Sequence, residues 1–140
     1  MRRNLGAAEL GDLLELPLVA VMATYRSDGS VLLSPVWHRW RDGGFDVAVG
    51  PNDVKLRHLG RDPRLSVLVY DYQPPYRGLE ARGEARLVPG AATEAIASMA
   101  VRYLGPDEGP AYAATAGDGS VLVRLEPAEL RGWDFADELG

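Results

Sequence analysis

The chain has 140 residues, 46% hydrophobic and 25% charged, which is the composition of one soluble globular domain, and no linker or repeat divides residues 1–140. Its net charge of −5 at pH 7 disfavours a general nucleic-acid binder, and the absence of cysteine excludes disulfides, thiolate catalysis and thiolate metal sites. No apolar run reaches the roughly 18 residues of a membrane span, and residues 1–16 lack the apolar stretch of a signal peptide, so we expect a cytoplasmic protein with no membrane partner.

The first part of the chain predicts a short helix and then three strands. Leucines at helical spacing favour a helix within residues 7–16, ending before Pro17. Three apolar runs follow, separated by glycine-containing turns: residues 18–26, 31–40 and 45–49. Asp28-Gly29 fits the tight turn of a hairpin between the first two runs. Pro35 cannot donate a ladder hydrogen bond, so we expect a sheet edge, a bulge or a cofactor contact there.

The remainder of the chain predicts two helices and four strands. A short helix over residues 52–61 would begin with Asn52 as its N-cap and end near Gly60, and a longer helix over residues 92–104 would end at Gly105-Pro106. The strands are residues 65–70, 79–87, 120–125 and 130–135. The second of these strands alternates apolar with charged residues, which favours a solvated outer face. Neighbouring strands joined by tight turns favour an antiparallel β-barrel with flanking helices (α+β) over a doubly wound parallel sheet.

Several common catalytic motifs are absent from the sequence. It contains no Gly-x-Gly-x-x-Gly dinucleotide fingerprint, no Gly-rich phosphate loop ending in Lys-Ser or Lys-Thr, and no Gly-x-Ser-x-Gly nucleophile motif. His38 and His58 are the only histidines and lack the spacing of metal ligands, so we expect no metal site. His38 falls within a predicted strand, and we interpret it as structural or dimer-facing rather than catalytic.

The densest group of cationic side chains lies in and just after the predicted short helix: Lys55, Arg57, His58, Arg61 and Arg64. A helix N-terminus with adjacent cations suits a phosphate group. However, Asp53 at the helix start would repel an anion, and residues two apart on a helix do not face each other. An anion site and a solvated basic helix therefore stay equal alternatives on spacing alone.

Aromatic side chains form a second candidate group for a flat ligand: Trp37, Trp40, Tyr70, Tyr72, Tyr76 and Trp133. These side chains could line a groove for a planar ring. Aromatic residues also fill cores and dimer interfaces, and that interpretation is favoured for any single one of them.

Six short motifs occur in a characteristic order over about residues 10 to 136: Ala20-Val21-Met22-Ala23-Thr24, Ser34-Pro35-Val36-Trp37, Lys55-Leu56-Arg57-His58-Leu59, Pro75-Tyr76-Arg77, Glu80-Ala81-Arg82-Gly83 and Arg131-Gly132-Trp133-Asp134-Phe135. Together they resemble the pyridoxamine 5′-phosphate oxidase-like proteins, the FMN-binding split-barrel superfamily. Within it, the chain is most similar to the actinobacterial deazaflavin-dependent reductase branch. The resemblance implies one antiparallel split-barrel domain and a homodimer with two cofactor sites at its interface.

The resemblance also implies which residues hold the cofactor, either a deazaflavin (coenzyme F-420) or FMN. Ser34-Pro35-Val36 corresponds to the strand that lies along the ring, Lys55 and Arg57 to the phosphate-binding positions, and Trp133 to an aromatic residue that packs near the site from either subunit. Arg61 and Arg77 could bind the anionic tail of the deazaflavin. The remaining residues assigned to the cofactor site are Trp37, Gly50 and His58.

The leading functional hypothesis is an oxidoreductase that transfers a hydride from its cofactor to a small organic substrate. Tyr72 and Tyr76 are the candidate proton donors. One alternative is a non-catalytic protein of the same fold that binds a flavin, haem or a tetrapyrrole. Another is a dimeric barrel whose ancestral site is empty, which Asp53 makes plausible because it would repel a phosphate.

Overall fold

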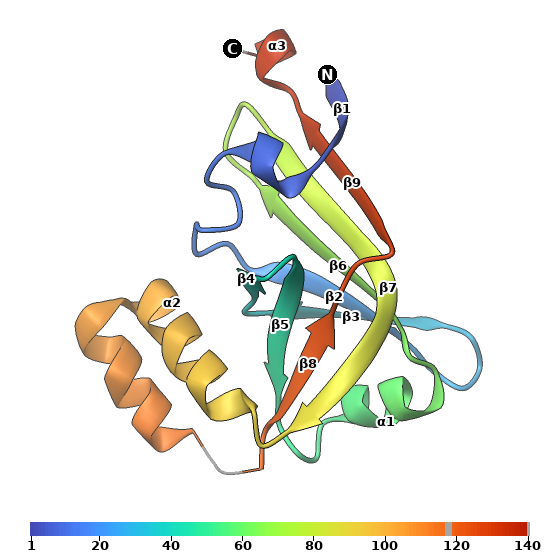
Figure 1. Ribbon diagram of the computed structural model, residues 1–140, viewed down its shortest axis with the longest axis vertical. Helices are drawn as coiled ribbons and strands as arrows, with labels where there is room; N and C mark the ends of the chain where they lie inside the picture. Colours follow the sequence, from blue (N-terminus) through green and yellow to red (C-terminus); the bar gives the residue numbers. More distant parts are fainter. Residues whose placement is uncertain (117–118, 140) are drawn as a thin grey trace.

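The computed structural model describes residues 1–116 and 119–139, and within them nine antiparallel strands form one sheet curled into a half-barrel (Figure 1). The strands are β1 (Arg2–Leu5), β2 (Ala20–Tyr25), β3 (Val31–Val36), β4 (Arg39–Arg41), β5 (Gly44–Val49), β6 (Arg64–Asp71), β7 (Arg77–Pro89), β8 (Val121–Leu125) and β9 (Glu129–Asp134). Their order is β3-β2-β6-β7-β8-β5-β4, and β9 pairs with both β7 and β1. This is the antiparallel split barrel with flanking helices that the sequence predicts.

The β2–β3 hairpin forms as predicted and lies at an edge of the sheet. Gly29 takes a positive φ of 86° at the turn, a conformation that glycine adopts without strain. Pro35 pairs with Val21 of β2, and among the described residues β3 has no strand on its other side, so the missing amide hydrogen of Pro35 costs no ladder bond.

The prediction of one continuous strand over residues 31–40 is wrong. The chain leaves the sheet at Trp37 and His38, and β4 then pairs with β5 in the other half of the barrel. The reason lies in helix α2 (Ala92–Thr115): Tyr103 Oη accepts a hydrogen bond of 3.2 Å from the His38 amide, and Arg102 donates to the His38 carbonyl. Side chains from a distant helix thus satisfy the backbone groups that a ladder would otherwise use.

β7 is the longest strand and joins the two halves of the barrel. Its first part, from Arg77 to Glu84, pairs with β6, while residues Ala85–Pro89 pair with β8. Apolar Leu79 and Ala81 are fully buried, whereas the intervening charged side chains point outward, which confirms the predicted alternation.

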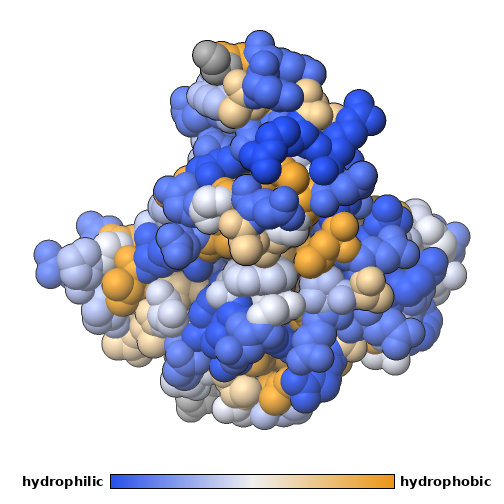
Figure 2. Space-filling model, turned by 45° about the horizontal axis from the view of Figure 1, so that its top comes forward, coloured by the Kyte–Doolittle hydropathy of each residue, from blue (hydrophilic) through white to orange (hydrophobic). Residues whose placement is uncertain are grey.

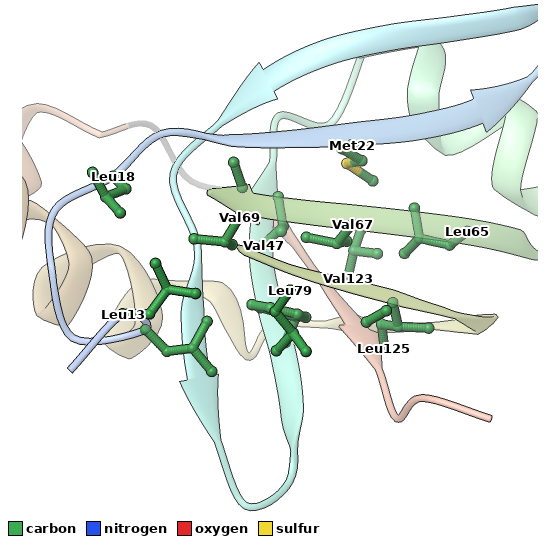
Figure 3. Close-up of a cluster of buried hydrophobic side chains, with 14 of the residues drawn as sticks. Leu13, Leu18, Met22, Val47, Leu65, Val67, Val69, Leu79, Val123 and Leu125 are labelled. Carbon is green, nitrogen blue, oxygen red and sulfur yellow. The ribbon is translucent and has the colours of Figure 1, made fainter. Parts of the chain in front are cut away.

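The main hydrophobic core fills the inside of the half-barrel. Figure 3 shows its side chains converging from the segment before β2 and from five strands: Leu13, Leu18, Met22, Val47, Leu65, Val67, Val69, Leu79, Val123 and Leu125. The face of the molecule shown in Figure 2 is mostly hydrophilic, and its apolar patches are small and separate. Burial of each such core side chain stabilises the fold by about 1.5–3 kcal/mol.

The N-cap of helix α1 (Val54–Arg61) lies one residue later than predicted, and the helix continues past Gly60, where it was predicted to end. Asp53, not Asn52, is the N-cap, because the Asp53 side chain accepts a hydrogen bond from the Lys55 amide. Gly60 lies inside the helix and its φ is not positive, so the expected glycine stop does not form; Asp62 follows as the C-cap.

Helix α2 (Ala92–Thr115) consists of two segments that meet at Gly105, whose φ of 94° and ψ of 174° are not helical. The first segment confirms the predicted helix over residues 92–104. The sequence predicts no element for the second, which is rich in Gly, Ala and Pro. The two segments run back alongside each other (Figure 1). They approach closely because Gly109 has no side chain: a Cβ there would lie 2.6 Å from the Val101 Cα.

Three terminal features differ from the sequence-based expectation. The predicted helix over residues 7–16 is only a short 3-10 helix, η1 (Ala7–Leu10), followed by turns. The strand β1 and the helix α3 (Ala136–Leu139) have too few residues to give a periodic pattern. Among the residues that the structure describes, no helix is both long and apolar enough to span a membrane.

Candidate functional site

A pocket of about 340 Å³ lies between the end of β3, β5 and both segments of α2. Its lining comprises Pro35, Val36, Trp37, Ala48, Ile96, Met99, Tyr112, Ala116 and Ser120. Among these lining residues, the polar side-chain groups are the hydroxyls of Tyr112 and Ser120 and the indole N–H of Trp37. None of the lining side chains is charged. A pocket of this size, with uncharged and partly aromatic walls, suits a flat ring rather than an ion.

The indole of Trp37 is fixed between two tyrosines of α2. It stacks on Tyr103 with ring centroids 4.9 Å apart and 5° between the planes, and it meets Tyr112 at 5.2 Å with a tilt of 58°. Tyr103 is anchored in turn, since its hydroxyl donates a 2.6 Å hydrogen bond to the Leu18 carbonyl. The wall that Trp37 gives the pocket is therefore preorganised.

Three of the four consecutive residues 34–37 assigned to the cofactor site meet at this pocket. Pro35, Val36 and Trp37 line it, whereas Ser34 is buried and its side chain points into the barrel interior beside β2. Pro35 also faces outward at the sheet edge, so the pocket opens next to the exposed face of the β2–β3 hairpin. Gly50 follows the pocket strand β5 and leads toward α1; no atom lies within 4 Å of a Cβ built there.

His38 follows Trp37 of the pocket wall, but its own side chain does not line the pocket. Its side chain is completely buried, in edge-to-face contact with Phe45, and neither ring nitrogen has a hydrogen-bond partner among the described residues. Burial lowers the pKa of His38 from 6.5 to about 3, and the positive charge of Arg102 contributes in the same direction. The ring is therefore neutral at physiological pH and has no access to a ligand.

The start of α1 carries an internal ion pair. Asp53 Oδ1 accepts a 2.9 Å hydrogen bond from the Lys55 amide, and Asp53 Oδ2 lies 3.0 Å from Lys55 Nζ. Burial works to raise the pKa of Asp53, but the hydrogen bonds and charge from Lys55 outweigh it and hold that pKa below its ordinary value. Asp53 is thus ionised at neutral pH and neutralises the one lysine of the chain.

The other cationic residues of α1 do not converge with Lys55. His58 is buried, and its Nδ1 lies 3.0 Å from the Thr24 hydroxyl. Burial lowers the pKa of His58, and three nearby arginines lower it further, so it adds no charge at neutral pH. Arg61 donates to the Tyr25 carbonyl at 2.7 Å. Arg57 is exposed and makes no ion pair with any residue that the structure describes.

The remaining predicted site residues lie at the opposite end of β7. Arg77 begins this strand and donates to the Leu10 carbonyl and to Asp12, both at 2.6 Å, which ties down the N-terminal segment. Trp133 covers Gly78, where a Cβ would lie 2.3 Å from the indole. Tyr72 and Tyr76 are exposed in the loop before β7, 58% and 44% accessible respectively.

This end of β7 is too far from α1 for both to hold one cofactor phosphate within a single chain. Glu84 of β7 pairs with Arg64, which follows α1 almost directly. Seven residues of strand separate Arg77 from Glu84, a distance of about 23 Å. Within one chain, Arg77, Trp133 and the two loop tyrosines therefore do not share a phosphate site with α1.

The amino-acid sequence matches the pyridoxamine 5′-phosphate oxidase family over residues 7–134. The chain belongs to this family. No curated protein shows significant sequence similarity to it. The family assignment agrees with the curled antiparallel sheet.

Several solved structures of this family's fold resemble the chain. A conserved hypothetical protein from Mycobacterium tuberculosis is 28% identical, with a TM-score of 0.77 over 94% of this chain and 86% of its own. An F-420 reductase is 30% identical, with a TM-score of 0.70 over 85% of this chain and 93% of its own. A haem-storage protein from Vibrio cholerae, 16% identical with a TM-score of 0.66 over 89% and 92% of the two chains, shares the fold alone.

The site fits the ring of a family cofactor better than its phosphate. The pocket offers uncharged walls that include two aromatic side chains, whereas the expected phosphate position at Lys55 already holds the Asp53 carboxylate. Among the described residues, no three histidine, cysteine, aspartate or glutamate side chains come together as a metal site would require.

Sequence reasoning missed the half of the pocket that α2 supplies. Ile96 and Met99 read as ordinary core positions of an amphipathic helix, and Tyr112 falls in the stretch with no periodic signal. No sequence pattern indicated the role of Arg26, whose positive charge helps to lower the pKa of His58. No local pattern links these residues, since they meet Trp37 or α1 only through the fold.

Proposed function

We propose that this protein is an oxidoreductase that binds coenzyme F-420, or alternatively FMN, in a groove extending from the Trp37 pocket toward α1. It transfers a hydride to a small organic substrate and acts in the cytoplasm. The observation that carries the proposal is the uncharged, aromatic-walled pocket that Pro35, Val36 and Trp37 form. Family membership and the 30% identity to an F-420 reductase support it.

The bound cofactor would supply the hydride, and the chain's own residues would orient the ring and keep water away from it. Trp37 would provide a rigid aromatic wall, because Tyr103 already holds it. Met99 and Ile96 would make the floor apolar. The hydroxyls of Tyr112 and Ser120 are the described groups placed to donate a hydrogen bond or a proton inside this pocket.

We also propose that the active form is a homodimer. On the outward face of β3, Val31 is 44% exposed and Leu33 is 64% exposed. Strand register places Ala23 opposite Leu33 and Val21 opposite Pro35 on the same face, which makes an apolar surface that a second copy would cover. Since Pro35 borders both this face and the pocket, a partner subunit bound here would complete the groove. The end of the partner's β7 that carries the loop tyrosines and Trp133 would then lie near the pocket.

Non-catalytic haem carriage by the same fold is the second candidate and has less support. A histidine that ligates haem must present an accessible imidazole to the iron. His38 is completely buried, and His58 is turned toward Thr24. A non-catalytic flavin carrier would use the same pocket, and only turnover with a reducible substrate separates it from the reductase.

The test is a fluorescence titration of the full chain with coenzyme F-420 and, separately, with FMN. Trp37→Ala and Tyr112→Ala should each weaken binding at least ~10-fold, about 1.4 kcal/mol, because each removes a wall of the pocket. Leu104→Ala is the matched control, since this partly exposed residue lies on α2 but does not line the pocket. Absence of binding for both cofactors, or equal effects of all three substitutions, would contradict the proposal.

A further inference from the structure

The Asp53 carboxylate holds the two donors that an anionic ligand would need at the start of α1. One of its oxygens accepts from the Lys55 amide at 2.9 Å, and the other lies 3.0 Å from Lys55 Nζ. A backbone amide in the first turn of a helix together with an ammonium group is the usual pair of donors for a phosphate. The carboxylate therefore occupies the position that a ligand phosphate would take.

The other cations of α1 that the structure describes do not share a ligand position with Lys55. Arg57 is two residues from Lys55, and on a helix such side chains point about 200° apart. His58 is buried against Thr24, and Arg61 donates to a backbone carbonyl. A phosphate that approached Lys55 would meet the Asp53 charge at close range, and both groups are negative.

We propose that Asp53 is the residue that sets ligand specificity at this site, by occupying the phosphate position and selecting against a phosphate monoester bound at Lys55. This inference rests on the proposed function, because it takes the start of α1 to be part of the cofactor groove. It predicts that affinity comes mainly from the ring pocket. It also predicts that a single neutralising substitution at Asp53 frees Lys55 and creates a phosphate site.

Asp53→Asn is the decisive variant, because asparagine caps a helix about as well as aspartate but carries no charge. Asp62→Asn is the matched control: Asp62 flanks the other end of the same helix and pairs with Arg64 at 2.7 Å. The double variant Asp53→Asn/Lys55→Met removes the freed ammonium. All four proteins, wild type included, keep the full chain.

The first measurement is thermal unfolding in inorganic phosphate against sodium chloride of equal ionic strength, since a ligand that binds the folded state raises its stability. Asp53→Asn should bind phosphate at least ~10-fold more tightly than wild type, and the double variant should lose that gain. A wild type that binds phosphate as tightly as Asp53→Asn would overturn the inference. An equal gain in Asp62→Asn would also overturn it, because the effect would then follow net charge alone.

The second measurement compares riboflavin with FMN, which differ only by the phosphate group. Wild type should bind the two within about threefold of each other, and Asp53→Asn should favour FMN by ~10-fold. A wild type that already prefers FMN by that margin would overturn the inference. If neither coenzyme F-420 nor FMN binds while the phosphate gain persists, the proposed function fails and the role of Asp53 stands, so the two failures are distinguishable.

Discussion

Trp37 and Tyr103 lie nearly parallel, with ring centroids 4.9 Å apart, and this pair joins the end of β3 to the first segment of α2. Tyr103 Oη also donates to the Leu18 carbonyl and accepts from the His38 amide. One side chain therefore holds three parts of the chain that are distant in sequence. The position of the pocket wall depends on this contact more than on any local preference of β3.

Tyr103→Phe should lower the free energy of unfolding by about 1–3 kcal/mol, because it leaves the buried Leu18 carbonyl and His38 amide without their partner. The stacked ring is kept, so the fluorescence of Trp37 should change little. Tyr112→Phe is the control, since Tyr112 is 48% exposed. Urea unfolding measures both variants, and equal stability of the two would contradict the anchoring role of the Tyr103 hydroxyl.

Gly109→Ala and Gly60→Ala should change stability in opposite directions. At Gly109 the new Cβ would lie 2.6 Å from the Val101 Cα, and backbone atoms cannot move aside cheaply, so we expect a loss of about 1–3 kcal/mol. Gly60 lies inside α1 with no atom within 4 Å of its Cβ position, so alanine should stabilise by about 0.5–1 kcal/mol. Thermal and urea unfolding report the sign. A neutral Gly109→Ala would mean that the two segments of α2 separate readily.

The sequence predicts those features of the fold that arise from local chemistry. Gly29 forms the turn because the hairpin needs a positive φ, and Pro35 lies at an edge because it cannot donate to a ladder. The second segment of α2 escaped prediction because Gly109 and Pro110 are typical of loops. Here Gly109 permits close helix packing, an effect visible only once Val101 lies opposite.

The candidate site was predictable to a smaller extent. The resemblance of residues 34–37 to the family motif identified one wall of the pocket, whereas Tyr112 on the opposite wall is 75 residues away and follows no pattern. The cationic cluster was predicted from the density of basic side chains in residues 55–64. Its members separate because His58 turns inward to Thr24, 34 residues away, and Asp53 pairs with Lys55.

Asp46→Asn should be among the most destabilising substitutions in the chain. Its carboxylate is completely buried and pairs with Arg39 at 2.9 Å, Arg124 at 3.2 Å and Arg41 at 3.1 Å. Neutralising it leaves the nearly buried guanidinium groups of Arg39 and Arg124 with only the exposed carboxylates of Glu94 and Glu126 as partners. We expect a loss of about 3 kcal/mol. Asp42→Asn nearby is the control, because that side chain is 80% exposed. Chemical unfolding that shows similar small losses for both would contradict the central position of Asp46 in this ion-pair network.

His38 should make the stability of the protein fall between pH 7 and pH 5. Its pKa is about 3 in the folded state and 6.5 without burial, so between these values the unfolded chain binds a proton that the folded chain does not. Stability from this group is therefore complete above about pH 6.5 and decreases as the pH falls, by up to about 1.4 kcal/mol per pH unit. From pH 7 to pH 5 we expect a loss of about 2 kcal/mol, before the carboxylates titrate.

His38→Leu should abolish most of this pH dependence while keeping the fold, because leucine fills an apolar position and leaves no unpaired ring nitrogen. His58→Asn is the control and should retain most of the slope, although the lowered pKa of His58 contributes in the same direction. Urea unfolding at closely spaced pH values from 7 to 5 measures the slope for each protein. If His38→Leu keeps the wild-type slope, the His38 ring must accept a proton in the folded state, and water must then reach a side chain that is 0% exposed in this structure.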